Sequence, residues 1–235
     1  MHDFFRWQWN RLLKPKPEHR ADLVSWQAVN LNQIHSTQGR SATWLGHASV
    51  LIKSDGIHVL TDPIFSERAS PVSWLGPKRI KPLPVDPANL PRIDAVVISH
   101  NHYDHLDLPS LKRLNSQAGG PPLFVVPLGN AELLKRQGIS NVKALDWGQR
   151  IPVKDGLSVT LVPTQHWSKR NLLGDRNEAL WGGYVIQHHE WQAFFAGDTG
   201  YSKDFADIHA RMGDMHFAMI PIGAYAPRDF MRRRH

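Results

Sequence analysis

The chain has 235 residues, of which 41% are hydrophobic and 21% charged, a balance that is ordinary for a globular protein and excludes a disordered chain. The formal net charge of +7 favours acidic partners such as anionic lipid, phosphorylated substrates or nucleic acid, without choosing among them. The absence of cysteine excludes disulfides and thiolate ligands, so His, Asp and Glu must hold any metal.

The first 40 residues are expected to form an arm and a linker, followed by one domain over residues 41–235. Residues 1–14 are aromatic and basic, which suits a helix on a bilayer surface, although packing against the body of the protein is an equal alternative. Because no apolar run approaches the ~18 residues of a membrane span, we expect a cytoplasmic protein, peripheral on a membrane if the arm binds lipid.

The domain is expected to begin with a β-hairpin, whose strands at 48–53 and 57–61 flank a turn at 54–56. Residues 64–91 are rich in Pro, Ser and Gly and predict a long ordered loop. A strand at 95–98 and a helix at 107–114 follow.

The rest of the chain alternates further strands with two helices. Strands are expected at 123–127, 142–145, 151–153, 157–163, 181–186, 192–196 and 217–221, and helices at 130–137 and 202–210. Strands outnumber helices, and the helices interleave late. The pattern predicts an α/β sandwich of two sheets with helices outside.

Chemically informative side chains follow three of these strands. His100, His102, Asp104 and His105 come directly after 95–98, His166 follows 157–163, and Asp198 follows 192–196. Imidazole and carboxylate are good ligands for zinc and similar ions, so these strand ends predict a metal site at one edge of the sandwich. A serine-nucleophile site is disfavoured because no Gly-x-Ser-x-Gly elbow occurs, and no phosphate-cradling Gly-rich loop is present.

The spacing His-x-His-x-Asp-His at 100–105, with a later isolated His and an Asp in Gly-Asp-Thr-Gly, resembles the metallo-β-lactamase fold superfamily. Segments 44–49, 60–66, 76–79 and 220–225 are similar to its branch of N-acyl-phosphatidylethanolamine-hydrolysing phospholipases D. The resemblance implies an αββα sandwich of two mixed β-sheets flanked by helices.

The resemblance also implies a ligand set for two zinc ions. His100, His102 and His166 would hold the first ion, Asp104 and His105 the second, and Asp198 would bridge both, with Asp104 and Asp198 counted as catalytic. The family has one further ligand, a His in a His-Trp-Gly-Thr segment near the C-terminus, which this sequence does not contain. We therefore expect a domain that is incomplete at its C-terminus and a second zinc site short of one ligand.

Five further residues lie in segments that match the family. His47 and Asp62 are expected to orient metal ligands by hydrogen bonds, with ordinary turn chemistry as the alternative. Lys78 and Arg79 would meet a phosphate or else form a solvated loop, and Tyr225 would lie near the site.

The implied activity is zinc-dependent phosphodiester hydrolysis of a phospholipid substrate, in a phospholipase D reaction with a metal-bridging hydroxide as nucleophile. Nucleic acid is not the expected partner, and a homodimer stays open. Two alternatives also stay open: a metallo-hydrolase of another phosphoester or lactone, and an inactive metal-binding scaffold.

Overall fold

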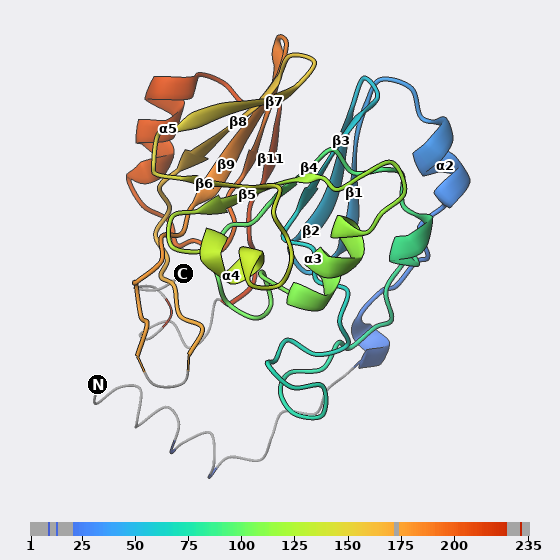
Figure 1. Cartoon of the computed structure of the whole chain (residues 1–235), viewed down its shortest axis with the longest axis vertical. Helices are drawn as coiled ribbons and strands as arrows, with labels where there is room; N and C mark the ends of the chain where they lie inside the picture. Colours follow the sequence, from blue (N-terminus) through green and yellow to red (C-terminus); the bar gives the residue numbers. More distant parts are fainter. Residues whose placement is uncertain (1–8, 10–12, 14–20, 172–173, 225–230, 232–235) are drawn as a thin grey trace.

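The computed structural model of the chain describes residues 9, 13, 21–171, 174–224 and 231 (Figure 1). Tyr225 and all of segment 1–14 except Trp9 and Leu13 lie outside the described residues, so the expectations for them stay predictions. Among the described residues, no helix combines the length and apolarity needed to cross a bilayer.

One sheet has six strands in the order β1-β2-β3-β4-β5-β6 and is mixed. Its first three strands pair antiparallel, and β3, β4, β5 and β6 pair parallel. The expected hairpin is β2–β3, and its turn places Asp55 and Gly56 at φ 48° and 89°. The bounds are β1 Arg40–Gly46, β2 Ser49–Ser54, β3 Ile57–Thr61, β4 Ala95–Val97, β5 Leu123–Pro127 and β6 Val142–Leu145.

The second sheet has five strands in the order β11-β10-β9-β8-β7. It is antiparallel except for the pair β10 and β11, so both sheets are mixed. The bounds are β7 Arg150–Lys154, β8 Leu157–Val162, β9 Gly183–His188, β10 Trp191–Phe195 and β11 Phe217–Met219.

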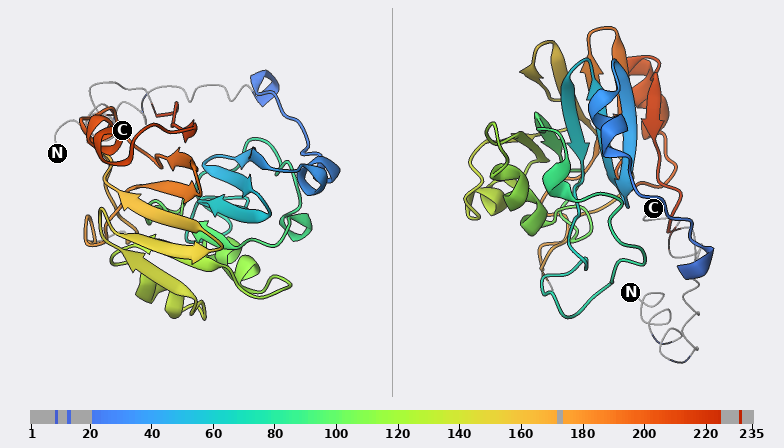
Figure 2. Two further views of the ribbon diagram at one scale, coloured as in Figure 1. Left: turned by 90° about the horizontal axis from the view of Figure 1, so that it is seen from above. Right: turned by 90° about the vertical axis from the view of Figure 1, so that its right-hand side faces the viewer.

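Alternating side chains on these strands build three apolar layers. Val59 of β3 and Ile186 of β9 belong to the core between the sheets, whereas the neighbouring Leu60 and Val185 belong to the outer cores. One outer core includes side chains of α3 (Leu108–Asn115) and α4 (Ala131–Lys135), and the other includes Ile208 of α5 (Asp204–Met212). Figure 2 shows these helices on opposite outer sides of the two sheets, which confirms the predicted αββα sandwich.

Regular structure begins earlier than expected. Helix α2 (Leu31–Ser36) forms within the expected linker, where the Asn30 side chain caps it by accepting from the Gln33 N–H. Ile34 is buried in the outer core of the first sheet, and Val29 and Leu31 pack partly against it, so these apolar residues hold the polar stretch against the domain. Strand β1 starts at Arg40 rather than after it. The domain boundary near residue 40 stays a prediction.

The long loop between β3 and β4 contains a single 3₁₀ turn, η2 (Pro87–Asn89), and no α-helix or strand, as the Pro and Gly content predicts. A bridge between Arg68 and Lys78 closes its first part into an irregular hairpin. In Figure 1 this loop and the one after β8 both hang from the lower edge of the sandwich.

Candidate metal centre

The candidate centre lies where strand ends from both sheets meet. His100–His105 follow β4 of the first sheet, His166 follows β8 and Asp198 follows β10 of the second sheet. His47 sits in the turn between β1 and β2, and Asp62 follows β3. Because β3 and β4 are parallel and the β1–β2 turn is at the same edge, residues distant in sequence come together here.

Three imidazoles converge on one point. His100 Nε2 lies 2.8 Å from His102 Nδ1 and 3.2 Å from His166 Nε2, and His166 Nε2 lies 3.3 Å from His102 Nδ1. The His100 and His166 side chains are buried. These are the three residues that the resemblance assigns to the first zinc, and their nitrogens could serve one ion together.

A second group lies beside the first. His47 Nε2 lies 3.2 Å from Asp104 Oδ2 and 3.3 Å from His105 Nε2. Asp198 lies between the two groups, because its Oδ2 is 3.4 Å from His105 Nε2 and 3.9 Å from His166 Nε2. The structure thus brings Asp104 and Asp198 to the Nε2 of His105 and places His47 beside Asp104 and His105, whereas the bridging role of Asp198 stays a prediction.

A buried hydrogen-bond network fixes which ring nitrogen of two histidines faces the centre. Asp62 Oδ2 accepts from His105 Nδ1 at 2.7 Å and from the Ser99 hydroxyl at 2.5 Å. Since the Ser99 hydroxyl donates to Asp62, it accepts from His100 Nδ1 at 2.9 Å. Both rings therefore carry a hydrogen on Nδ1, so each directs Nε2 toward the cluster. Asp62 occupies the ligand-orienting position that its family segment suggests.

The electrostatics of the cluster favour a cation. Burial lowers the pKa of His105, but the carboxylates of Asp198 and Asp104 raise it well above its ordinary value. Burial acts to raise the pKa of Asp104 and of Asp198, but nearby His105 holds both well below their usual range. His105 Nε2 faces two carboxylates, so a proton or a metal ion is needed between them. The donor set of nitrogen and carboxylate oxygen fits divalent transition-metal ions.

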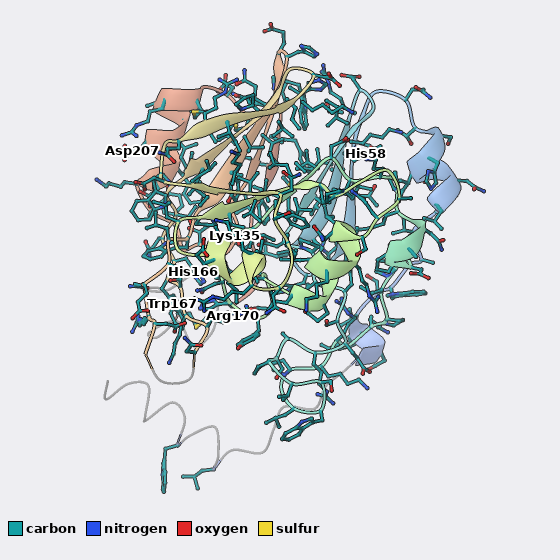
Figure 3. The ribbon with its side chains drawn as sticks, in the orientation of Figure 1. His58, Lys135, His166, Trp167, Arg170 and Asp207 are labelled. Atoms are coloured by element: carbon teal, nitrogen blue, oxygen red, sulfur yellow. The ribbon has the colours of Figure 1, made fainter. Side chains whose placement is uncertain are left out.

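Side chains of the loop after β8 contact the segment that carries His102 and His105. The sequence pattern did not predict these contacts. Arg170 Nη1 donates to the carbonyls of Asn101 and Leu106 at 3.0 and 2.9 Å, and its guanidinium stacks over Tyr103. The Trp167 ring packs edge-on against His102, with centroids 4.4 Å apart. Figure 3 shows His166, Trp167 and Arg170 together at the lower edge of the sandwich.

The two basic residues of the long loop have partners within it. Lys78 Nζ pairs with Glu67 at 2.7 Å, and Arg79 Nη2 donates to the Ile64 carbonyl at 2.7 Å. Arg79 thus ties the loop to the end of β3, which is a structural role that its family segment did not reveal. Both residues nevertheless line the cavity of about 1110 Å³ that also contains His47 and Asp104.

The chain is similar to known proteins over most of its length. A family model described as the beta-lactamase superfamily domain matches residues 58–235. The chain is 40% identical over 217 residues to N-acyl-phosphatidylethanolamine-hydrolyzing phospholipase D 1 of Caenorhabditis elegans, covering 88% of this chain and 60% of that protein. It is 38% identical over 199 residues to the mitochondrial enzyme of that name from Saccharomyces cerevisiae, covering 82% of this chain and 42% of that protein.

A solved structure supports the fold alone. A metallo hydrolase from the archaeon Ignicoccus hospitalis superposes with a TM-score of 0.57 at 22% identity, covering 79% of this chain and 72% of that one. The chain spans about half the length of the two curated relatives, at 60% and 42%. Because the family model matches most of the chain and the fold agrees, the chain belongs to the metallo-β-lactamase superfamily.

Proposed function

We propose that this chain is a zinc-dependent phosphodiesterase that hydrolyses N-acyl-phosphatidylethanolamine-type phospholipids to phosphatidic acid and N-acylethanolamine. One observation carries the proposal. The His100–His102–His166 group and the His105–Asp198 contact meet at one sandwich edge, in a chain 40% identical to the Caenorhabditis elegans phospholipase D.

Two bound divalent ions would supply an activated water and neutralise charge that develops on the phosphate oxygens. The chain's own residues hold the donors in place. Asp62 and Ser99 keep Nε2 of His105 and His100 directed toward the cluster. The carboxylates of Asp104 and Asp198 are held ionised, so their oxygens can accept hydrogen bonds from an attacking water.

The proposed reaction breaks one bond and needs only water. The oxygen of water bonds to phosphorus, and the bond from phosphorus to the ethanolamine oxygen breaks. The phosphate stays with the diacylglycerol part, and the leaving oxygen takes up one proton from the water. The products are then phosphatidic acid and an N-acylethanolamine.

The surroundings of the cluster suit an amphiphilic substrate. The cavity beside His47 and Asp104 is lined by apolar side chains and by three basic ones, namely Val29, Trp44, Ile64 and Ile80 with Lys78, Arg79 and Lys81. On the same long loop, Trp74 and Leu75 are exposed by 74% and 59%. Basic and apolar groups together favour contact with an anionic lipid surface, and membrane association through residues 1–14 remains part of the proposal.

A substrate panel tests the proposed function. Metal-free protein is reloaded with zinc and supplied with N-acyl-phosphatidylethanolamine in mixed micelles, a sugar-phosphate lactone or RNA. We expect turnover of the phospholipid, with release of phosphatidic acid measured by mass spectrometry. His102→Ala should lower the rate by at least ~10³-fold because it removes a metal donor, whereas His209→Ala, on the surface of α5, should leave it unchanged.

The alternatives give different results in the same panel. Turnover of RNA or lactone without turnover of the phospholipid would replace the proposed substrate. Zinc binding without turnover of any of the three would favour the inactive scaffold.

A further inference from the structure

The geometry points to His47 as a direct ligand of the second metal ion, in a site made of His47, Asp104, His105 and Asp198. This inference rests on the proposed two-metal function and deepens it. For that ion the resemblance supplies Asp104, His105 and the bridging Asp198, together with a His in a segment that this sequence does not contain, and it gives His47 a supporting role.

Distance is the first argument. The Nε2 of His47 lies 3.2 Å from Asp104 Oδ2 and 3.3 Å from His105 Nε2. Zinc ligand bonds of about 2.0–2.2 Å place the donors of one ion about 3.3–3.6 Å apart in tetrahedral geometry, close to both measured separations. The two separations match ligand-to-ligand distances around one ion.

The orientation of the rings is the second argument. His105 Nδ1 donates to Asp62, so Nε2 is the ring nitrogen that faces the site, and its lone pair can bind an ion that replaces the Nε2 proton. The Nε2 atoms of His47 and His105 lie 3.3 Å apart, and Asp104 Oδ2 lies close to both. One cation could bind all three donor atoms. The rings of His47 and His105 meet edge-on at 4.9 Å between centroids, which leaves their Nε2 atoms convergent.

The backbone conformation at His47 is the third argument, because a hydrogen-bonded turn holds this residue in place. His47 has φ of 48°, a left-handed conformation that costs a non-glycine residue about 1 kcal/mol or more. The turn is held because the Trp44 indole N–H donates to the His47 carbonyl at 2.7 Å, next to the register shift between β1 and β2. His47 and Asp104 also line the cavity, so this ion would face the proposed substrate.

Metal binding to the 235-residue protein tests the assignment independently of activity. Zinc stoichiometry and affinity are measured by mass spectrometry and calorimetry for wild type, His47→Gln and the control His58→Gln. His58 lies half-buried on β3, far from the cluster in Figure 3. We expect two zinc ions for wild type and His58→Gln. For His47→Gln we expect one tightly bound ion and a loss of more than ~100-fold in affinity for the other, beyond the 10–100-fold typical of supporting residues.

Ring-nitrogen NMR of histidine-labelled wild type separates ligation from a hydrogen bond. The His47 nitrogen resonances should shift when the second equivalent of zinc is added, as expected for a ring nitrogen that binds the ion directly. His47 nitrogen resonances that do not change when the second equivalent of zinc is added would overturn the assignment. Two ions bound at wild-type affinity by His47→Gln, or a single ion in wild type, would also overturn it. Wild type that binds two ions and hydrolyses no phospholipid would refute the proposed function alone.

Discussion

At the scale of single residues, Asp62 orients two of the histidines of the centre through hydrogen bonds. Its Oδ1 accepts the Ser99 N–H at 2.7 Å, and its Oδ2 accepts from His105 and from the Ser99 hydroxyl. Burial raises its pKa, and the hydrogen bonds from His105 and Ser99 partly offset this effect. One carboxylate therefore orients His105 directly and His100 through a serine.

Replacing Asp62 by Asn is expected to weaken zinc binding by about 10–100-fold, since the amide has one acceptor oxygen where the carboxylate has two. Calorimetry of zinc binding measures the change. Asp55→Asn is the matched control, because Asp55 also has a positive φ but lies in the exposed β2–β3 turn. Equal zinc affinity for wild type and Asp62→Asn would show that the network does not tune the ligands.

The sequence predicted the cluster but not all of its contacts, for a physical reason. His100, His102, Asp104 and His105 are close in sequence, so their spacing alone signals a metal site. The approach of His47 to Asp104 spans 57 residues and depends on how the β1–β2 turn meets the loop after β4. No local pattern encodes such a contact. Ser99 and Arg170 were missed because a serine and a surface-type arginine carry no distinctive spacing.

At the scale of elements, the end of β10 must approach the end of β4 closely to deliver Asp198. Gly197 makes this approach possible. A Cβ there would lie 2.6 Å from the Ser99 Cβ, and the residue has φ of 62°. The glycine before Asp198 is therefore required both by its backbone conformation and by the space beside Ser99.

Gly197→Ala is expected to displace Asp198 from His105, lowering zinc affinity and destabilising the fold by about 1–3 kcal/mol beyond the backbone strain. Chemical unfolding and zinc calorimetry measure the two effects. Gly138→Ala shares the positive φ, at 81°, but its Cβ would meet nothing within 4 Å, so it isolates the strain. Equal effects of the two substitutions would mean that the contact with Ser99 is unimportant.

Elements were predicted well where the pattern is local and strong. Strand β8 is buried along its whole length, and the β2–β3 hairpin has its Asp-Gly turn, so both were found from sequence. Helix α2 was missed because its six residues are mostly polar, and only Ile34 is buried while Leu31 packs partly against the same core. Strand β1 was not among the predicted strands, because its start alternates exposed and half-buried residues and gives little apolar signal.

At the scale of the whole molecule, the centre joins the two sheets. His100, His102, Asp104 and His105 come from the first sheet, and His166 and Asp198 from the second. An ion bound by residues of both sheets should therefore stabilise the sandwich as well as serve catalysis. Zinc at a concentration of 100 Kd would contribute about 2.7 kcal/mol, which for a domain of this size raises Tm by about 5–11 °C.

Without metal, the charges of the centre make stability depend on pH in a definite direction. The pKa of His105 is raised in the folded state, so its contribution is complete below the unfolded value of about 6.5 and is lost as the pH rises through the folded pKa. The pKa values of Asp104 and Asp198 are depressed, so their contribution is present above about 3.9 and is lost as the pH falls through their folded values. Of these three groups, His105 is therefore the one whose contribution to stability declines above neutrality.

We therefore expect the Tm of the metal-free protein to fall as the pH rises above about 6.5 and through the raised pKa of His105. The Tm of the zinc-loaded protein should fall less, because the ion replaces the proton on His105. Differential scanning calorimetry of both forms across this range measures the gap, which should widen with pH. Metal-free Asp198→Asn is the control. It removes one of the two carboxylates that raise the pKa of His105 and should flatten the decline. A Tm difference between the two forms that stays constant or narrows with rising pH would contradict the idea that His105 is protonated in the metal-free protein.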